Sequence, residues 1–365
     1  MARLIDPTIA RLVARRLAGD AGEGSYLLDR LHSDLEEAVP VAERLVAEAS
    51  GIPAPPPVRW GVIDRGAWAD ANIAGMTRLL SPLTEKVGKR LDSLPMAVRL
   101  GQTAAVSVEV GVLLGYISRR VLGQYDLLVP EAEGEQPRIR RWGRRALPSG
   151  DGSGVLYFVG PNIVDTERRF GFVPREFALW VALHEVTHRF QFDGVPWLRQ
   201  RFLSLLESYL GLMDIDARSL AGRIGSAAAR LLSGSVPPEE RNPVYLLASD
   251  EQRARLDEIQ GLMAVVEGHG NHVMDTVGAS EIPSFERMRR VFEGRRAQTT
   301  RLQRAIHHAI GLEMKLRQYE LGQAFCDEVV ARGGRGSLSR LWEGPGNLPT
   351  MAELRRPELW LKRVA

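Results

Sequence analysis

The stretch that decides the fold is His184-Glu185-Val186-Thr187-His188, which lies within an apolar segment spanning residues 174–192. Residues four apart on an α-helix lie about 40° apart around its axis, so two imidazoles at this spacing can bind one metal ion from one face. Glu185 projects beside such an ion and not towards it, so its carboxylate can accept a proton from a water that the ion activates. The stretch therefore predicts a zinc site with His184 and His188 as ligands and Glu185 as general base.

The residues around this motif favour a mostly buried helix. Pro174 suits a first helical turn and Glu176 suits the positive end of the helix dipole, while Gly194 and Pro196 end the segment. Its apolar side chains are Phe177, Leu179, Trp180, Val181, Leu183, Val186 and Phe190. Polar groups are costly to bury without partners, so three of them at ligand spacing in an apolar helix argue for a metal site. The alternative is an exposed helix whose histidines and glutamate are solvated.

Length and composition exclude several classes of protein. With 365 residues, 44% of them hydrophobic, the chain can form one large domain or two modest ones. Its net charge is +3 and acidic residues occur throughout, so bulk charge gives no indication of nucleic-acid binding. The single cysteine, Cys326, cannot form an internal disulfide, which is typical of a reducing compartment. We therefore expect a cytoplasmic protein.

The apolar stretches predict helices that do not cross a membrane. Residues 1–18 carry Asp6 and four arginines among their apolar residues, which is typical of an amphipathic helix and not of a signal peptide. The most apolar stretch, residues 100–122, is interrupted by Glu109, Arg119 and Arg120, so it lacks an uncharged run of 18 residues. We expect this stretch to be a buried helix.

Helical periodicity dominates the rest of the chain. Ser249, followed three residues later by Gln252, is a capping signal at the start of a long apolar pattern. The clearest strand is Val155-Leu-Tyr-Phe-Val159, which we expect to be an edge strand bordering the metal helix and able to pair with extended substrate. The predicted fold is mainly α (α+β), with a small edge sheet beside the H-E-x-x-H helix. Helices are predicted over residues 7–50 with a break at 19–24, and over 59–122, 247–277, 285–292 and 303–330.

Residues 130–154 differ in character from their surroundings. Three glutamates precede five arginines that surround Trp142, and a stretch rich in proline and glycine follows. A basic run with one aromatic residue can bind nucleic acid or an acidic peptide, but a solvated loop is the favoured interpretation. We expect an N-terminal helical region at 1–129, an exposed charged loop at 130–154 and a catalytic region at 155–365, with the two helical regions packed as one unit.

The third metal ligand is predicted downstream, because a catalytic zinc usually has three protein ligands and one water. Glu267, His269 and His272 interrupt an otherwise apolar helical stretch. Glu267 precedes Gly268, whose missing side chain lets another helix or the metal come close. The two histidines lie about 200° and 140° around the helix from Glu267, so they cannot share its face. Glu267 is the favoured ligand, with His272 and His269 as the alternatives.

Several of these segments together resemble the zincin-like metallopeptidase type 2 family. This is a group of bacterial candidate hydrolases, some of them named for an association with biosynthesis of a deazaflavin coenzyme. The resemblance implies a predominantly helical, gluzincin-type zincin fold with Glu267 as the third ligand, and it implies no particular substrate. The segments that carry it are His184-Glu-Val-Thr-His188, Gly194-Val-Pro-Trp-Leu198, Val266-Glu-Gly268, Val273-Met-Asp275 and Gly311-Leu-Glu-Met-Lys-Leu-Arg-Gln-Tyr319, with Gly61-Val-Ile-Asp64, Asn72, Gly123-Gln-Tyr-Asp126 and Leu341-Trp342 also fitting.

A later helix supplies the group that stabilises the oxyanion in gluzincins, because negative charge develops on the carbonyl oxygen there. Lys315 and Tyr319 lie four apart on one helical face, and His307 and His308 are also downstream. Tyr319 is the predicted donor, since a phenol can donate without the desolvation cost of a buried ammonium. The alternative is an ordinary amphipathic surface helix.

The sequence thus predicts a zinc-dependent metallohydrolase, most specifically a metallopeptidase, acting on a peptide or protein substrate. Its Zn²⁺ is held by His184, His188 and Glu267, while Glu185 and Tyr319 act in catalysis. The alternative function is that of a zinc-binding scaffold or regulatory protein with a zincin fold and no peptidase activity. Neither a nucleic-acid partner nor a membrane span is expected.

Overall fold

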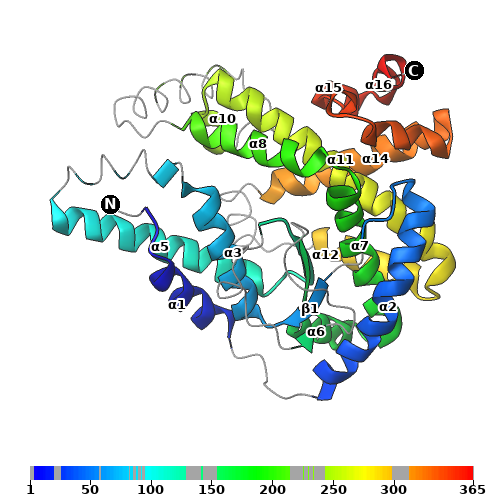
Figure 1. Ribbon diagram of the computed structural model, residues 1–365, viewed down its shortest axis with the longest axis horizontal. Coiled ribbons are helices and arrows are strands. Elements are labelled where there is room, and N and C mark those ends of the chain that lie inside the picture. The colour runs from blue at the N-terminus through cyan, green and yellow to red at the C-terminus, as the bar shows by residue number, and fades with distance from the viewer. Residues whose placement is uncertain are drawn as a thin grey trace. The chain divides into compact units, whose positions relative to one another are not determined.

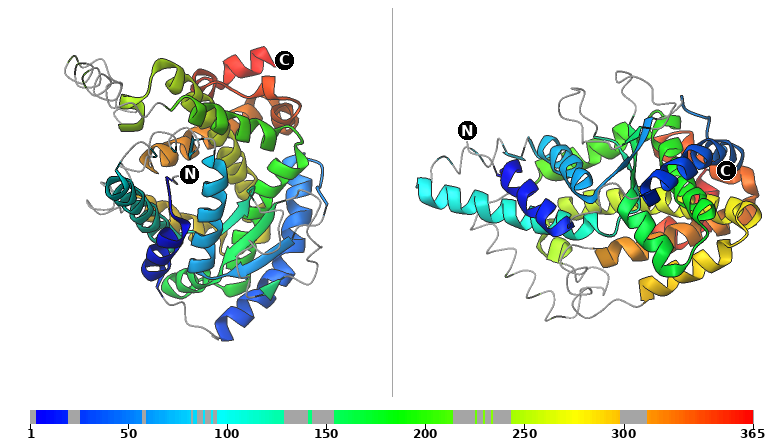
Figure 2. Two further views of the ribbon diagram at one scale, coloured as in Figure 1. Left: turned by 60° about the vertical axis from the view of Figure 1, so that its left-hand side comes forward. Right: turned by 90° about the horizontal axis from the view of Figure 1, so that it is seen from below.

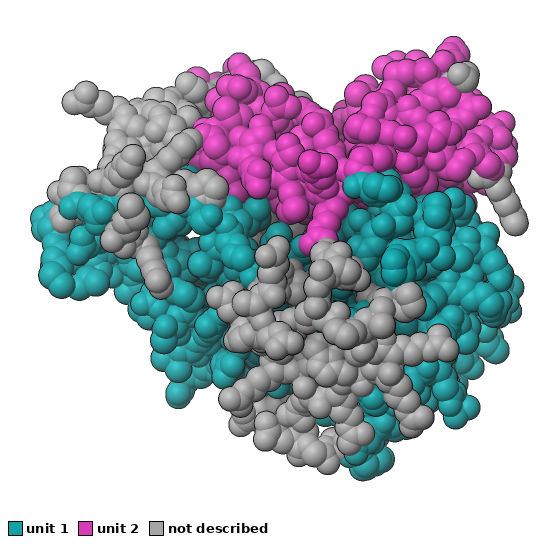
Figure 3. Space-filling model, in the orientation of Figure 1, with its two compact units in different colours: residues 1–196, 276–286 teal, residues 197–275, 287–365 magenta. Residues whose placement is uncertain are grey.

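The computed structural model forms two compact units (Figure 3). Unit 1 comprises residues 1–196 and 276–286, and unit 2 comprises residues 197–275 and 287–365. This division differs from the ranges 1–129, 130–154 and 155–365 expected from the sequence, because it groups the H-E-x-x-H segment with the N-terminal helices. The residues described are 4–19, 26–56, 59–81, 95–128, 141–142, 154–213, 243–297 and 312–364, with isolated positions in 83–92 and 225–233.

The fold is mainly helical, as predicted, with one small sheet in unit 1. The helices of unit 1 are α1 (Pro7–Ala18), α2 (Tyr26–Ser50), α3 (Arg65–Leu79), α5 (Met96–Ser118), α6 (Gly160–Phe170) and α7 (Pro174–Gly194). Its strands are β1 (Arg59–Ile63), β2 (Gly123–Asp126), β3 (Arg141–Trp142) and β4 (Val155–Val159). The predicted break between the first two helices is confirmed, since α1 ends at Ala18 and α2 begins at Tyr26.

The sheet has the strand order β2-β4-β1-β3. Strands β1 and β4 are parallel, while β2 pairs antiparallel with β4 and β3 pairs antiparallel with β1. The strand predicted at residues 155–159 is confirmed as β4, but its expected place at the edge of the sheet is wrong. All five of its residues are buried, and a continuous apolar run of this kind is typical of a strand covered on both faces.

The edge strand next to the H-E-x-x-H helix is β2, which contacts α7. Strand β1 is a second departure from expectation, because residues 59–63 were predicted to be helical. The predicted charged loop lies mostly outside the described residues, but two of its residues form β3, which pairs with Gly61 and Val62.

Helices cover both faces of the sheet in unit 1 (Figure 1, Figure 2). Val155, Tyr157 and Val159 point to one face, where they join a hydrophobic cluster with residues of α1, α3 and α5. On the other face Phe158 meets the edge of Trp60, and Trp60 in turn lies against His32 of α2. Helix α2 packs along α7, so the metal-motif helix belongs to this second layer.

Helix α5 packs closely against α1 but leaves much of its surface exposed. A Cβ on Gly111 would lie 2.7 Å from the carbonyl oxygen of Ala10, so the two helices are nearly in backbone contact. By length and composition α5 could cross a membrane, a property that core helices also have, and only 22% of its most apolar window is buried. The expectation of a buried helix at this position is therefore wrong for its outer face, where Val108 and Val112 are exposed.

In its described residues, unit 2 consists of helices joined by short turns and contains no strand. The capping signal predicted at Ser249 is confirmed, because its Oγ accepts from the Gln252 N–H at 3.2 Å while Gln252 Oε1 accepts from the Ser249 N–H at 2.8 Å. The elements contributing to unit 2 are α8 (Leu198–Gly211), α10 (Pro243–Leu247), α11 (Asp250–Glu281), α12 (Phe285–Ala297), α14 (Leu312–Gly333), η3 (Arg335–Trp342), η4 (Pro345–Asn347), α15 (Met351–Arg355) and α16 (Pro357–Arg363), of which the adjoining ends of α11 and α12 belong to unit 1.

Gly268 lies where α11 crosses α14 in unit 2. A Cβ on Gly268 would lie 2.1 Å from the carbonyl carbon of Gly322, which no real side chain can tolerate. A Cβ on Gly322 would meet the Ala264 carbonyl oxygen at 1.8 Å in the same way. The close helix approach predicted for Gly268 is confirmed, and it fixes the backbone immediately after Glu267.

Candidate metal centre

Helix α7 carries the H-E-x-x-H motif and is anchored at both ends. At its start Glu176 accepts hydrogen bonds from the backbone N–H and the hydroxyl of Ser284, both within unit 1. Near its end the fully buried Arg189 pairs with Glu43 of α2 at 2.7 Å. The helix ends at Gly194, where a Cβ would lie 2.8 Å from the Pro53 carbonyl oxygen. The predicted helix is confirmed over its whole length.

Arg189 directly follows the motif, and the structure shows what partners its buried charge has. Besides Glu43, Arg189 lies 3.8 Å from Asp193, and the hydroxyl of Tyr125 donates to Asp193. Burial lowers the pKa of the Arg189 guanidinium, while the carboxylates of Glu43 and Asp193 oppose that shift. A buried charge needs such partners, and together they tie α7 to α2 and to strand β2.

The two histidines of the motif present the same ring nitrogen to the same point. The Nε2 atoms of His184 and His188 are 3.2 Å apart, and the rings are nearly perpendicular at 83°, with centroids 4.6 Å apart. Two nitrogen ligands at about 2.05 Å from a tetrahedral zinc lie roughly 3.3 Å from each other. The separation of the two nitrogens therefore fits a shared metal ion.

Gln191 lies one turn beyond His188 and contacts the far side of its ring. Its Oε1 is 3.0 Å from His188 Nδ1, and the glutamine side chain is fully buried. A hydrogen bond to Nδ1 leaves Nε2 as the nitrogen that can bind a metal. Gln191 lies outside the H-E-x-x-H motif.

Glu185 is buried against the edge strand. Its side chain is 6% exposed, and a Cβ on Gly123 of β2 would lie 2.7 Å from both Cγ and Oε1 of Glu185. The absence of a side chain at Gly123 is therefore what makes room for the carboxylate. This contact could not be inferred from the sequence, because it joins residues 62 positions apart through the packing of β2 on α7.

We expect Gly123→Ala to move the Glu185 carboxylate without touching the histidines. An alanine methyl cannot occupy a point 2.7 Å from Cγ, so either the carboxylate or the strand must shift. A displacement of about 1 Å in a catalytic group can lower the rate by about 10²-fold. Any hydrolytic turnover by the protein should fall accordingly, while zinc content measured by elemental analysis stays the same. Unchanged turnover would show that the contact places no constraint on the base.

The three candidates for the third ligand lie on α11 in unit 2 and have distinct surroundings. Glu267 is 7% exposed, on a helix whose position is set by the glycine crossing described above. His269 is buried edge-to-face against Trp342, with ring centroids 4.9 Å apart. His272 is 2.7 Å from Asp327 through its Nδ1. The surroundings of both histidines match the alternative of helix-contact residues.

Asp275 lies two turns beyond Glu267 on α11 and has charged and polar partners within unit 2. Asp275 accepts from Gln323 Nε2 at 2.7 Å and lies 3.3 Å from Arg289. Burial raises the pKa of the Asp275 carboxyl, and the nearby Arg289 opposes that shift.

Tyr319, the predicted oxyanion donor, lies on α14, but its side chain and that of Lys315 fall outside the described residues. His307 and His308 lie outside the described residues altogether.

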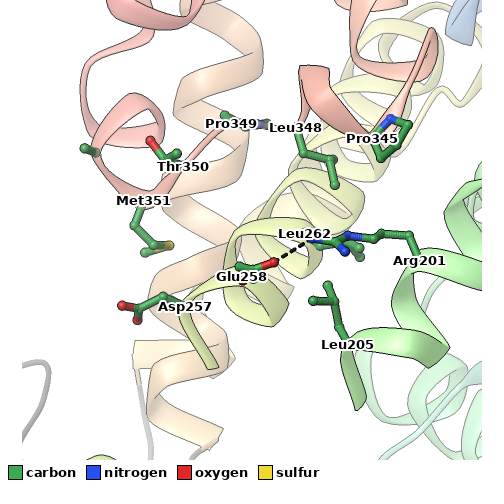
Figure 4. A pocket seen from close by; sticks show the side chains of 11 residues that line it. Arg201, Leu205, Asp257, Glu258, Leu262, Pro345, Leu348, Pro349, Thr350 and Met351 are labelled. Atoms are coloured by element: carbon green, nitrogen blue, oxygen red, sulfur yellow. Dashed lines mark hydrogen bonds and ion pairs between the residues drawn. The ribbon is translucent and has the colours of Figure 1, made fainter. Parts of the chain in front are cut away.

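Unit 2 also contains a cavity of about 380 Å³ between α8, α11 and residues 345–352 (Figure 4). Its floor includes the buried Leu205 and Leu262. Glu258 on its wall bonds to Arg201 and also to Arg255, each at 2.6 Å. No residue predicted to act in catalysis or metal binding lines this cavity.

Comparison with known proteins supports the interpretation of the motif. The profile of a family described as "Zincin-like metallopeptidase" matches residues 5–361. A crystal structure of a candidate hydrolase with a novel fold, from Chloroflexus aurantiacus, is 33% identical in sequence. The match has a TM-score of 0.66 and covers 99% of this chain and 98% of the other. A search of curated proteins gave no match.

Proposed function

Since this chain belongs to the zincin-like metallopeptidase family, we propose that it is a zinc-dependent hydrolase that cleaves peptide bonds. One observation carries the proposal. The Nε2 atoms of His184 and His188 are separated by the distance that a shared zinc requires, and the buried carboxylate of Glu185 lies on the same helix. The similarity to a candidate hydrolase over nearly the whole chain supports the same class of reaction.

The proposed zinc ligands are His184, His188 and Glu267. Each offers one atom that can bind a metal, an imidazole nitrogen or a carboxylate oxygen. Two imidazoles and one glutamate form the ligand set of several zinc peptidases and leave a fourth position for water. Glu267 is preferred to His272, because its carboxylate is buried and is the group on α11 that offers a ligand atom together with the two imidazoles, whereas His272 pairs with Asp327, whose side chain is 54% exposed.

The chain's own residues then account for the proton transfers. When bound, zinc polarises the scissile carbonyl and lowers the pKa of a water in the open position. Glu185 accepts the proton of the attacking water and can return it to the leaving amine, as a general base and then a general acid. The Glu185 carboxylate fills the space that a side chain on Gly123 would occupy, so the backbone of β2 limits the carboxylate on that side. Tyr319 is the proposed donor to the oxyanion.

We propose an unidentified peptide or protein as the substrate, without a nucleic-acid partner, in a reducing compartment. The last point rests on Cys326, a free thiol that is fully buried and whose pKa is raised by that burial. A chain with this single cysteine forms no internal disulfide, which is typical of proteins in a reducing compartment. The cytoplasm is the compartment that fits best.

A peptide-library digestion tests the proposed activity. Protein produced without a metal-affinity tag and loaded with one equivalent of zinc should cleave a subset of library peptides, and a chelator should abolish the cleavage. Products are identified by mass spectrometry, with Glu185→Gln protein as the control for contaminating peptidases. Stoichiometric zinc without any cleavage that depends on Glu185 would instead support the alternative of a zinc-binding scaffold.

A further inference from the structure

We propose that Gln191 is a positioning residue for the metal centre, holding His188 in the tautomer that binds zinc through Nε2. The inference rests on the proposed zinc site and extends it by one residue. Its starting point is the 3.0 Å separation between Gln191 Oε1 and His188 Nδ1. Gln191 is neither part of the H-E-x-x-H motif nor a proposed zinc ligand.

Gln191 and His188 lie three residues apart on α7, so helix geometry alone brings their side chains together. Residues three apart on a helix are neighbours on its surface, so the amide reaches the His188 ring without any change of backbone. The Gln191 side chain has no exposed surface, and burial restricts the rotamers available to it. The ring of His188 is thus held on its Nδ1 side, while its Nε2 lies 3.2 Å from Nε2 of His184.

The choice of tautomer follows from hydrogen-bond chemistry. A neutral imidazole has one N–H donor and one acceptor nitrogen, and only the acceptor can bind a metal. When the amide oxygen faces Nδ1, it accepts the Nδ1–H and leaves the lone pair on Nε2. The reverse amide orientation would place an N–H₂ donor at Nδ1 and force the ring proton onto Nε2, which blocks metal binding. Zinc binding therefore selects the orientation in which Oε1 faces the ring.

At this buried position a neutral amide destabilises the folded protein less than a carboxylate would. Metal-bound histidines commonly donate their second N–H to a carboxylate or a backbone carbonyl. At a fully buried site on α7, which already carries the buried Glu185, a second carboxylate would add a charge that is costly to bury. Glutamine provides the same acceptor oxygen without that charge.

The experiment compares zinc affinity in four proteins by competition with a chromophoric chelator. Gln191→Leu removes the acceptor, and we expect about a 10- to 100-fold weaker zinc affinity. Gln191→Glu retains an oxygen at the same reach, so it should bind zinc within about threefold of wild type, or more tightly, as carboxylate partners do. The matched control is Thr187→Val, which removes another fully buried polar group from α7. The Thr187 hydroxyl donates to the carbonyl oxygen of Leu183 and not to the ring of His184 or His188. The zinc affinity of Thr187→Val should match that of wild type.

A spectroscopic measurement separates positioning from a general loss of structure. Cobalt replaces zinc in such sites and has visible absorption bands that depend on ligand geometry. We expect the bands of Gln191→Leu to shift or weaken, while Gln191→Glu and Thr187→Val keep the wild-type spectrum. If Gln191→Leu fails to fold, Gln191→Met, a flexible apolar side chain of similar length, provides the same comparison.

The outcomes distinguish this inference from the proposed function. Wild-type protein that binds no zinc contradicts the proposed function itself. Wild-type protein that binds one zinc, together with a Gln191→Leu affinity and cobalt spectrum equal to wild type, contradicts only the role of Gln191. Equal losses of affinity in Gln191→Leu and Thr187→Val also overturn it, because they assign the effect to the helix and not to the hydrogen bond.

Discussion

Replacing His188 with alanine is expected to weaken zinc binding by about two to three orders of magnitude. A four-coordinate zinc site in a protein is worth roughly 10–16 kcal/mol at neutral pH, so one ligand of four contributes about 2.5–4 kcal/mol. The loss should be larger than that of any variant that leaves the ligands in place, because no neighbouring side chain on α7 can substitute for the missing nitrogen. The measurement is zinc stoichiometry after dialysis, with affinity obtained by chelator competition.

Two further substitutions complete this prediction. His184→Ala and Glu267→Ala should give losses of the same order, since each removes one proposed ligand. His272→Ala is the matched control on α11, and it should retain one zinc per chain because His272 is not one of the proposed ligands and pairs with Asp327 instead. Full zinc in Glu267→Ala together with a loss in His272→Ala would transfer the role of third ligand to His272.

The second large effect is expected from Glu185→Gln, which retains the shape of the side chain and removes the base. Peptide hydrolysis should fall by about 10²- to 10⁴-fold, the usual contribution of a general acid–base group. Zinc affinity should remain close to that of wild type, because Glu185 is beside the proposed metal and is not a ligand. The comparison is between kcat values at saturating substrate and zinc.

An exposed glutamate of the neighbouring helix provides the control for this substitution. Glu48→Gln removes one carboxylate from α2, where Glu48 pairs with Arg44 at the surface and both side chains are more than half exposed. Such a pair contributes little to stability, so neither activity nor zinc content should change. Activity retained in Glu185→Gln would show that a different group activates the water.

The elements that could be predicted from the sequence are those whose signals are local. Helix α7 was recognised from its apolar spacing and from the glycine and proline that end it, and the cap of α11 from the pair Ser249 and Gln252. Strand β4 was recognised because all five of its residues are apolar and β-branched or aromatic side chains dominate. Each of these signals lies within a few residues of the element that it predicts.

The strands that were missed depend on partners distant in the chain. Strand β2 has only four residues, Gly-Gln-Tyr-Asp, without an apolar alternation, and its strand character comes from pairing with β4. Strand β1 is a short apolar run that periodicity alone cannot distinguish from a helix. Because β2 was missed, the edge of the sheet was assigned to residues 155–159 and the contact between Gly123 and Glu185 was not foreseen.

The candidate site divides in the same way. His184 and His188 lie on one helix, so their spacing in the sequence was enough to predict that the two imidazoles meet. The contact between Gln191 and His188 could also have been predicted, because the two residues lie at helical spacing. It was missed because glutamine is not a usual metal ligand and the motif does not include it. The choice among Glu267, His269 and His272 needed their surroundings, which a single sequence does not contain.

X-ray diffraction at the zinc absorption edge, on crystals of untagged protein, tests the proposal of a catalytic zinc centre most directly. We expect one anomalous peak per chain, bound by Nε2 of His184, Nε2 of His188 and the carboxylate of Glu267, with a water in the fourth position. An open position occupied by water is the mark of a catalytic zinc, whereas four protein ligands mark a structural one. A zinc ion with a fourth protein ligand in place of the water would contradict the proposal of a catalytic zinc. The absence of an anomalous peak between the two histidines would contradict the proposed zinc site itself.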